Sequence, residues 1–96
     1  MRIEWSAGAF ADYDSILDYL VREFGVQIAK EFQDKLDYNV TVLSEFPMVG
    51  RSEYLNPKTY IEYRSLSCRH YKIVYAPLGE RLIIVSLWNN RRNPAT

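Results

Sequence analysis

The chain has 96 residues, of which 48% are hydrophobic and 25% are charged, and its formal net charge is zero. This length supports one core in a single domain spanning residues 1–96, and this composition excludes an intrinsically disordered chain. The single cysteine, Cys68, excludes an internal disulfide, and no apolar run reaches the roughly 18–20 residues of a membrane span. We therefore expect a cytoplasmic protein that makes no membrane contact.

The first half of the chain predicts a short strand and two helices. Residues 2–5 form the strand, and Ser6 is a good N-cap for the helix that follows. Gly25 is placed to end the first helix and Pro47 to stop the second, so the short break between them predicts an antiparallel hairpin. Apolar residues recur at steps of three and four along both helices: Phe10, Tyr13, Ile16, Leu17, Leu20 and Phe24, then Ile28, Phe32, Leu36, Val40, Leu43 and Phe46.

The second half predicts a loop and then a sheet. Residues 48–59 contain Gly50, Asn56 and Pro57 and are typical of a loop. Strands follow at 60–66, 69–75 and 81–88, and the turns between them are so short that the strands must be antiparallel neighbours. The fold class is therefore α+β with the order β-α-α-β-β-β, a helical hairpin packed on an antiparallel meander whose other face stays partly open.

The zero net charge hides a strong asymmetry between the two halves. Residues 1–57 carry five basic and ten acidic residues, whereas residues 58–96 carry seven basic and two acidic ones. Such an asymmetry is consistent with an anionic partner for the basic half, or simply with helices that carry more acids than strands do.

Several kinds of chemistry are excluded by the residue types. The chain has one His and one Cys and no glycine-rich phosphate loop or nucleophile elbow, so we expect no metal site and no cofactor. Metal-free RNA cleavage needs a base, an acid and fixed positive charge. Arg64 and Lys72 fit the cationic role if both project to the open face, and His70 is either a base or a hydrogen-bonded surface residue.

The end of the last strand carries a further basic feature. Arg91 and Arg92 follow strand 81–88 almost directly and precede Pro94, which blocks further regular structure. They form either a clamp for phosphate or carboxylate, or a solvated terminus. Together with the basic sheet, they suit a large, partly anionic macromolecule better than a small metabolite.

The combination of these motifs resembles the RelE/ParE family of toxins from bacterial type II toxin–antitoxin pairs. The likeness spans nearly the whole chain in the right order. It is carried by Trp5, Ser6, Ala9, Asp12, Ile16, Tyr19, Leu20, Phe24, Ala29, Phe32, Leu36, Leu43, residues 47–51, residues 64–66, residues 71–75, residues 83–88 and residues 91–94. The resemblance implies the same β-α-α-β-β-β fold and a cognate antitoxin protein in a toxin–antitoxin hetero-oligomer.

Two activities occur in this family, and the resemblance favours one of them. RelE-like members cut mRNA on the ribosome, and this would assign catalytic roles to Arg64, Lys72 and His70. ParE-like members bind DNA gyrase, and this would place Trp88, Arg91 and Arg92 at the target contact. The chain has Asn89 and Asn90 where the nucleases usually place a Tyr or His, and its loop 48–59 is poor in lysine. Both departures favour the ParE-like activity, with the mRNA endonuclease as the alternative.

Overall fold

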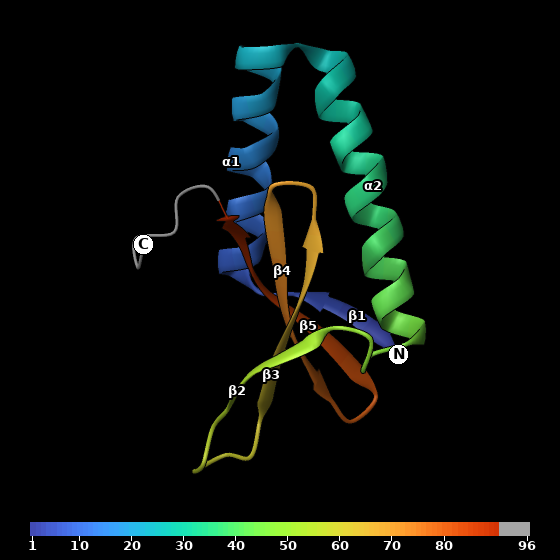
Figure 1. The fold of residues 1–96 in the computed structure, drawn as a ribbon, viewed down its shortest axis with the longest axis vertical. Helices are drawn as coiled ribbons and strands as arrows, with labels where there is room; N and C mark the ends of the chain where they lie inside the picture. The colour runs from blue at the N-terminus through green and yellow to red at the C-terminus, as the bar shows by residue number, and fades with distance from the viewer. Residues whose placement is uncertain (91–96) are drawn as a thin grey trace.

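The computed structural model describes residues 1–90 as two layers, a helical hairpin and a five-stranded sheet (Figure 1). The sheet order is β1-β5-β4-β3-β2. The elements in chain order are β1 (Arg2–Trp5), α1 (Ala7–Phe24), α2 (Val26–Glu45), β2 (Arg51–Leu55), β3 (Glu62–Cys68), β4 (Tyr71–Leu78) and β5 (Arg81–Asn89).

The helical hairpin begins and turns where the sequence predicts. Ser6 caps α1, because its Oγ accepts a hydrogen bond from the Ala9 amide at 3.0 Å, and the same Oγ donates to the Val85 carbonyl at 2.9 Å. Gly25 adopts φ 93°, which a residue with a side chain rarely adopts, and so allows the reversal into α2. Asp12 in α1 accepts from the Leu87 amide at 3.0 Å, which ties the helix to β5.

Fewer helix residues are buried in the core than the predicted apolar stripes contain. Phe10, Phe24, Ile28 and Phe46 are exposed, and small Ala9 and Ala29 are buried close to the helix axes. The helical turn extends beyond the end of the sheet (Figure 1), so residues near it have no strand to pack against. The buried cluster also contains Leu20, Phe32, Leu36, Val40 and Leu43 from the helices, and Tyr71, Ile73, Tyr75, Leu82, Ile84 and Leu87 from the sheet.

The predicted α+β fold and its element order are confirmed, with two corrections to the sheet. Residues 51–55, predicted as loop, form the edge strand β2, which pairs antiparallel with β3. The sheet is also mixed, because β1 pairs parallel with β5. Periodicity identifies a strand but not its partner, and every residue of β2 is exposed, so β2 shows no apolar alternation.

The strand boundaries differ at two turns. Tyr60, predicted to open a strand, adopts φ 60° and lies before β3, which begins at Glu62. The turn between β3 and β4 is at Arg69 and His70 rather than at Ser67 and Cys68, because Cys68 is buried and Arg69 takes the positive φ of 58°.

Register assigns the sheet residues to two faces. Arg64, Leu66 and Cys68 pair with Tyr75, Ile73 and Tyr71, which lie in the core beneath the helices. The alternate residues form the open face, which we define by Ser65, Ser67, Lys72, Val74, Ser86 and Trp88. A bulge between Ser52 and Tyr54 in β2 shifts the register there and leaves Glu53 unpaired. Within residues 1–90, no helix combines the length and apolar content that crossing a membrane requires.

Candidate functional site

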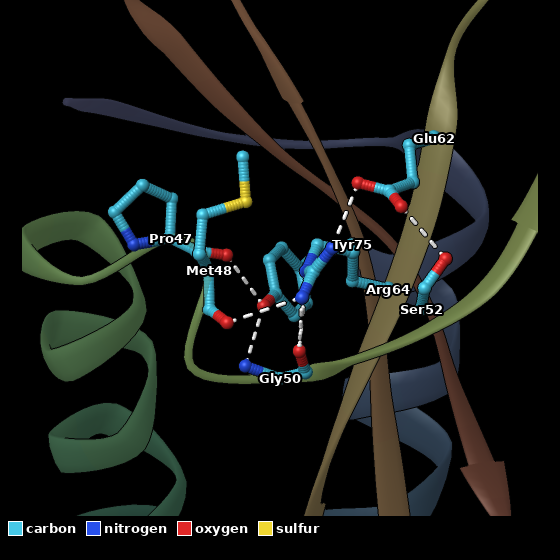
Figure 2. Close-up of polar contacts among 7 residues, drawn as sticks. All are labelled: Pro47, Met48, Gly50, Ser52, Glu62, Arg64 and Tyr75. Carbon is cyan, nitrogen blue, oxygen red and sulfur yellow. Dashed lines mark hydrogen bonds and ion pairs between the residues drawn. The ribbon is translucent and has the colours of Figure 1, made fainter.

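The most highly connected polar group of the described residues lies where the chain passes from α2 to β2. We call it the latch and define it by Gly50, Glu62, Arg64 and Tyr75 with the carbonyls of Pro47 and Met48 (Figure 2). The Arg64 Nη2 donates to the carbonyls of Gly50 at 2.6 Å and of Met48 at 3.1 Å, and Nε donates to Gly50 at 3.1 Å. Arg64 Nη1 pairs with Glu62 Oε1 at 2.7 Å.

Tyr75 closes the latch from beneath. Its hydroxyl donates to the Pro47 carbonyl at 2.7 Å and accepts from the Gly50 amide at 3.0 Å. A Cβ on Gly50 would meet the Tyr75 hydroxyl and lie 2.6 Å from the Ser65 carbonyl, so only glycine fits there. The loop between α2 and β2 is thus held to the sheet by a side chain from β3 and one from β4.

The charges of the latch are matched internally. The hydrogen bond from Ser52, and then that from Arg64, lower the pKa of the Glu62 carboxyl, and the hydrogen bond to Glu62 raises the pKa of Arg64. The Arg64 side chain is only 14% exposed. Its guanidinium is therefore a structural cation that satisfies backbone carbonyls.

A second polar group lies on the open face, and we call it the open-face cluster: Arg51, Glu53, Ser65 and Lys72. Glu53 Oε2 accepts from the Ser65 hydroxyl and from Lys72 Nζ at 3.2 Å, and Arg51 Nε lies 3.9 Å from the same oxygen. The Ser65 hydrogen bond is the main cause that lowers the pKa of Glu53. The cluster lines a shallow hollow of about 500 Å³ with Ser67 and Asn90, and it has more cationic than acidic groups.

A third surface lies where α1 passes the end of β5. Two adjoining hollows of about 540 and 330 Å³ share Tyr19, Tyr71 and Asn89. Their walls include exposed Phe24, Ile28 and Trp88, and basic Arg22 and Arg69 lie at their rims beside acidic Asp12 and Glu31. We call this surface the helix–β5 groove.

The structure does not bring the predicted catalytic residues together. Arg64 is in the latch on the helix side, Lys72 is in the open-face cluster, and His70 is in the β3–β4 turn and lines the helix–β5 groove. The condition that Arg64 and Lys72 both project to the open face is not met, because Arg64 pairs in register with the core residue Tyr75. Their catalytic roles stay predictions.

The predicted target-binding residues are partly described. Trp88 lies near the end of β5, is 44% exposed and borders the helix–β5 groove. Arg91 and Arg92 lie outside the described residues. The role of all three stays a prediction.

Sequence reasoning missed Gly50, Glu53 and the hydroxyl of Tyr75. Glu53 fell within the predicted loop, although turn residues on both sides of 51–55 could have indicated a short edge strand. Tyr75 is fully buried, as an apolar strand residue would be, but its hydroxyl donates to the Pro47 carbonyl of the loop. Only the tertiary fold reveals that contact.

We find no candidate metal centre within residues 1–90. No group of three His, Cys, Asp or Glu side chains there is arranged to hold an ion. Burial raises the pKa of the Cys68 thiol, which favours the unreactive protonated form.

The fold is shared with a protein of known structure. A solved structure described as the chromosomal ParDE TA system from P. aeruginosa matches with a TM-score of 0.74, covering 93% of this chain and 95% of that chain. At 21% sequence identity, this likeness shows the shared fold. A search of curated proteins gave no match.

The family follows from the sequence model that fits the chain. The model for the ParE toxin of type II toxin–antitoxin system, parDE, matches residues 3–94, which is nearly the full length. The chain therefore belongs to the ParE toxin family of type II toxin–antitoxin systems.

Proposed function

We propose that this toxin inhibits growth by binding a protein target, DNA gyrase, and that it has no hydrolytic activity of its own. The observation that carries this proposal is the latch. Its guanidinium, the sheet arginine that a RelE-like nuclease would need, is occupied by two backbone carbonyls and Glu62.

The contacts that bind Arg64 within the latch argue against a catalytic role for its guanidinium. A cation that stabilises the transition state of phosphodiester cleavage must be free to pair with the phosphate oxygens. Turning Arg64 toward a phosphate would leave the Gly50 and Met48 carbonyls without their donor and Glu62 without its ion-pair partner, which costs about 1–3 kcal/mol per orphaned group. Gyrase is named because the ParE-like resemblance implies it.

Trp88 is the proposed anchor of the target contact. Tryptophan is enriched at positions that dominate binding energy in protein interfaces, and a half-exposed indole beside a groove is available to a partner. Arg91 and Arg92 come next in sequence and would add charge pairing at the rim of the same contact.

A supercoiling assay with purified toxin and purified gyrase tests the proposal. Wild-type toxin should inhibit supercoiling, and Trp88→Ala should require about thirty-fold more protein, as for a hot-spot residue. Phe10→Ala is the matched control, since Phe10 is also an exposed aromatic but lies on α1 outside the groove. Absence of inhibition by wild-type toxin at micromolar concentration would refute the gyrase target.

The proposed cognate antitoxin would neutralise the toxin by covering the helix–β5 groove. The groove has an apolar floor of Leu20, Phe32 and Leu87 and an exposed wall of Tyr19, Phe24 and Ile28. An amphipathic helix of the antitoxin, with acidic residues facing Arg22 and Arg69, fits this surface. Such a helix would also cover Trp88.

Co-purification with the protein of the adjacent gene tests the antitoxin contact. Phe24→Asp places an unpaired charge in the groove and should weaken the complex by at least about tenfold. Tyr38→Asp is the control, because Tyr38 is exposed on α2 and lines neither hollow of the groove. Equal retention of both variants would contradict this placement.

One observation favours the alternative of an mRNA endonuclease. The open-face cluster combines a carboxylate acceptor, Glu53, with two cations, Lys72 and Arg51, as acid–base cleavage of RNA requires. Intact transcripts during toxin-induced growth arrest would dismiss this alternative, whereas cleavage that is lost in Lys72→Met would replace the gyrase proposal.

A further inference from the structure

The connection between β2 and β3 holds one residue in a strained conformation. Tyr60 has φ 60°, in the left-handed region that a bulky side chain avoids, and its 79% exposure is the highest among the exposed large hydrophobic residues of the described chain. An exposed ring gains nothing from packing. The strain therefore has no explanation in the stability of the fold.

The connection holds position 60 in a left-handed conformation, but nothing in its backbone requires that the residue there be a tyrosine. Arg69, the other residue with positive φ and a side chain, sits in a two-residue turn between β3 and β4, where such values are usual. The connection that contains Tyr60 has six residues, from Asn56 to Ile61, between β2 and β3. A glycine or asparagine at position 60 would meet its backbone requirement without strain.

The connection is nevertheless firmly ordered by its own hydrogen bonds. The Asn56 side chain accepts from the amides of Lys58 at 2.9 Å and Thr59 at 3.3 Å. The Asn56 backbone pairs with the amide of Tyr60 at 2.8 Å and the carbonyl of Ile61 at 2.9 Å. Tyr60 is thus presented on a preorganised tip, which lowers the entropy cost of binding.

The surroundings of Tyr60 define the chemistry of a partner. Tyr54 and Leu55 on β2 are also exposed, and Tyr54 stacks on Tyr63 with ring centroids 6.2 Å apart. Lys58 lies in the same connection and has no ion pair among residues 1–90. The tip is therefore aromatic with one unpaired lysine, and its complement is an apolar cleft with carboxylates at its rim.

We propose that this hairpin tip is a protein-recognition element that inserts Tyr60 into such a cleft on the toxin's target. The inference rests on the proposed function, in that it requires a protein target. The antitoxin is not the assigned partner, because an antitoxin helix on the helix–β5 groove would leave the tip accessible: the helical turn beside the groove and the hairpin tip lie at opposite ends of the molecule (Figure 1). The target, which also contacts Trp88 under the proposed function, would then extend along the molecule from the end of β5 to the tip.

The experiment uses the full chain with the single change Tyr60→Gly, compared with Tyr60→Phe and with Tyr38→Ala. Tyr60→Gly removes both the ring and the strain, so its Tm should be unchanged or raised while inhibition of purified gyrase weakens about thirty-fold. Tyr60→Phe keeps the ring and should retain inhibition. Tyr38→Ala removes another exposed ring, on α2 and outside both hollows of the groove, and should inhibit like wild type.

The outcomes separate this inference from the proposed function. If Tyr60→Gly inhibits gyrase and arrests growth like wild type, or if Tyr38→Ala is equally impaired, the inference is overturned. If wild type does not inhibit gyrase but arrests growth in a Tyr60-dependent manner, the gyrase target falls and the recognition element stands. If Tyr60→Gly loses antitoxin binding but still arrests growth fully, the inference is overturned. If the wild-type chain inhibits neither gyrase nor growth, both proposals are overturned.

Discussion

The latch and the open-face cluster contain the same kinds of groups but differ in how those groups are used. Each has an arginine and a carboxylate that accepts from a serine hydroxyl, which for the latch carboxylate Glu62 is that of neighbouring Ser52, and they approach the sheet from opposite faces. In the latch the arginine side chain is 14% exposed and bonded to the backbone, whereas Arg51 in the open-face cluster is 81% exposed. Residue type alone therefore does not identify a functional cation, and the saturation of its donors is the better criterion.

The comparison also separates stability from activity. If the latch is structural, changes in it should lower the free energy of unfolding. Changes in the open-face cluster should leave stability nearly intact and would reveal any function there directly.

The largest expected effect is that of Gly50→Ala. The new methyl group would collide with the Tyr75 hydroxyl and the Ser65 carbonyl, so we expect a loss of about 3 kcal/mol in the free energy of unfolding, measured by denaturant titration. Gly8→Ala is the control, because its Cβ would meet nothing closer than 3.9 Å and should stabilise α1 by up to about 1 kcal/mol. Equal stability of the two variants would show that the loop is not latched.

The next largest effect is that of Arg64→Met. This change leaves the carbonyls of Met48 and Gly50 and the Glu62 carboxylate without their donor, and should cost about 2 kcal/mol. Arg81→Met removes an ion pair to Glu4 from a side chain that is 44% exposed and should cost about 0.5 kcal/mol or less. Thermal melting of both variants would rank them, and the reverse order would break the comparison.

A smaller effect on stability is expected for Lys72→Met. Its ion pair with Glu53 lies on the open face, and its loss should change the free energy of unfolding by no more than about 0.5 kcal/mol. Methionine preserves the length of the side chain. A loss larger than that of Arg64→Met would mean that the open-face cluster, and not the latch, stabilises the sheet.

The smallest effect concerns pH. The pKa of Glu62 is lowered in the folded state, so its contribution is fully present above the ordinary value of 4.5 and is lost as the pH falls through the lowered pKa. Wild-type Tm should therefore fall more steeply below pH 4.5 than that of Glu62→Gln, measured by thermal melting from pH 6 to pH 3. Parallel curves would show that Glu62 does not contribute through its charge.

Much of the fold could be predicted because it follows from local signals. The hairpin of α1 and α2 is marked by Ser6, Gly25 and Pro47, and β3, β4 and β5 are marked by apolar runs with short turns. The strand β2 could not be predicted with these signals, since a fully exposed edge strand lacks alternation. Its pairing with β3 is a tertiary contact that these local signals do not encode.

The site was less predictable than the fold for a related reason. Arg64 was identified as important from its residue type, but its partners, the carbonyls of the α2–β2 loop, are backbone groups that any sequence would offer. Tyr60 gave no signal at all, because a φ value depends on the closed geometry of the hairpin.

The sequence by itself determined the α+β class and the order of every element except β2, because turns, caps and periodicity act over a few residues. It also determined the membership in the ParE toxin family, since the family model matches residues 3–94. Only the tertiary structure decided which cations are bound internally and which are displayed. Burial and hydrogen-bond geometry arise when β2, β3 and β4 meet beneath the α2–β2 loop, and they determine whether the charge of an arginine is used within the fold or is available to a partner.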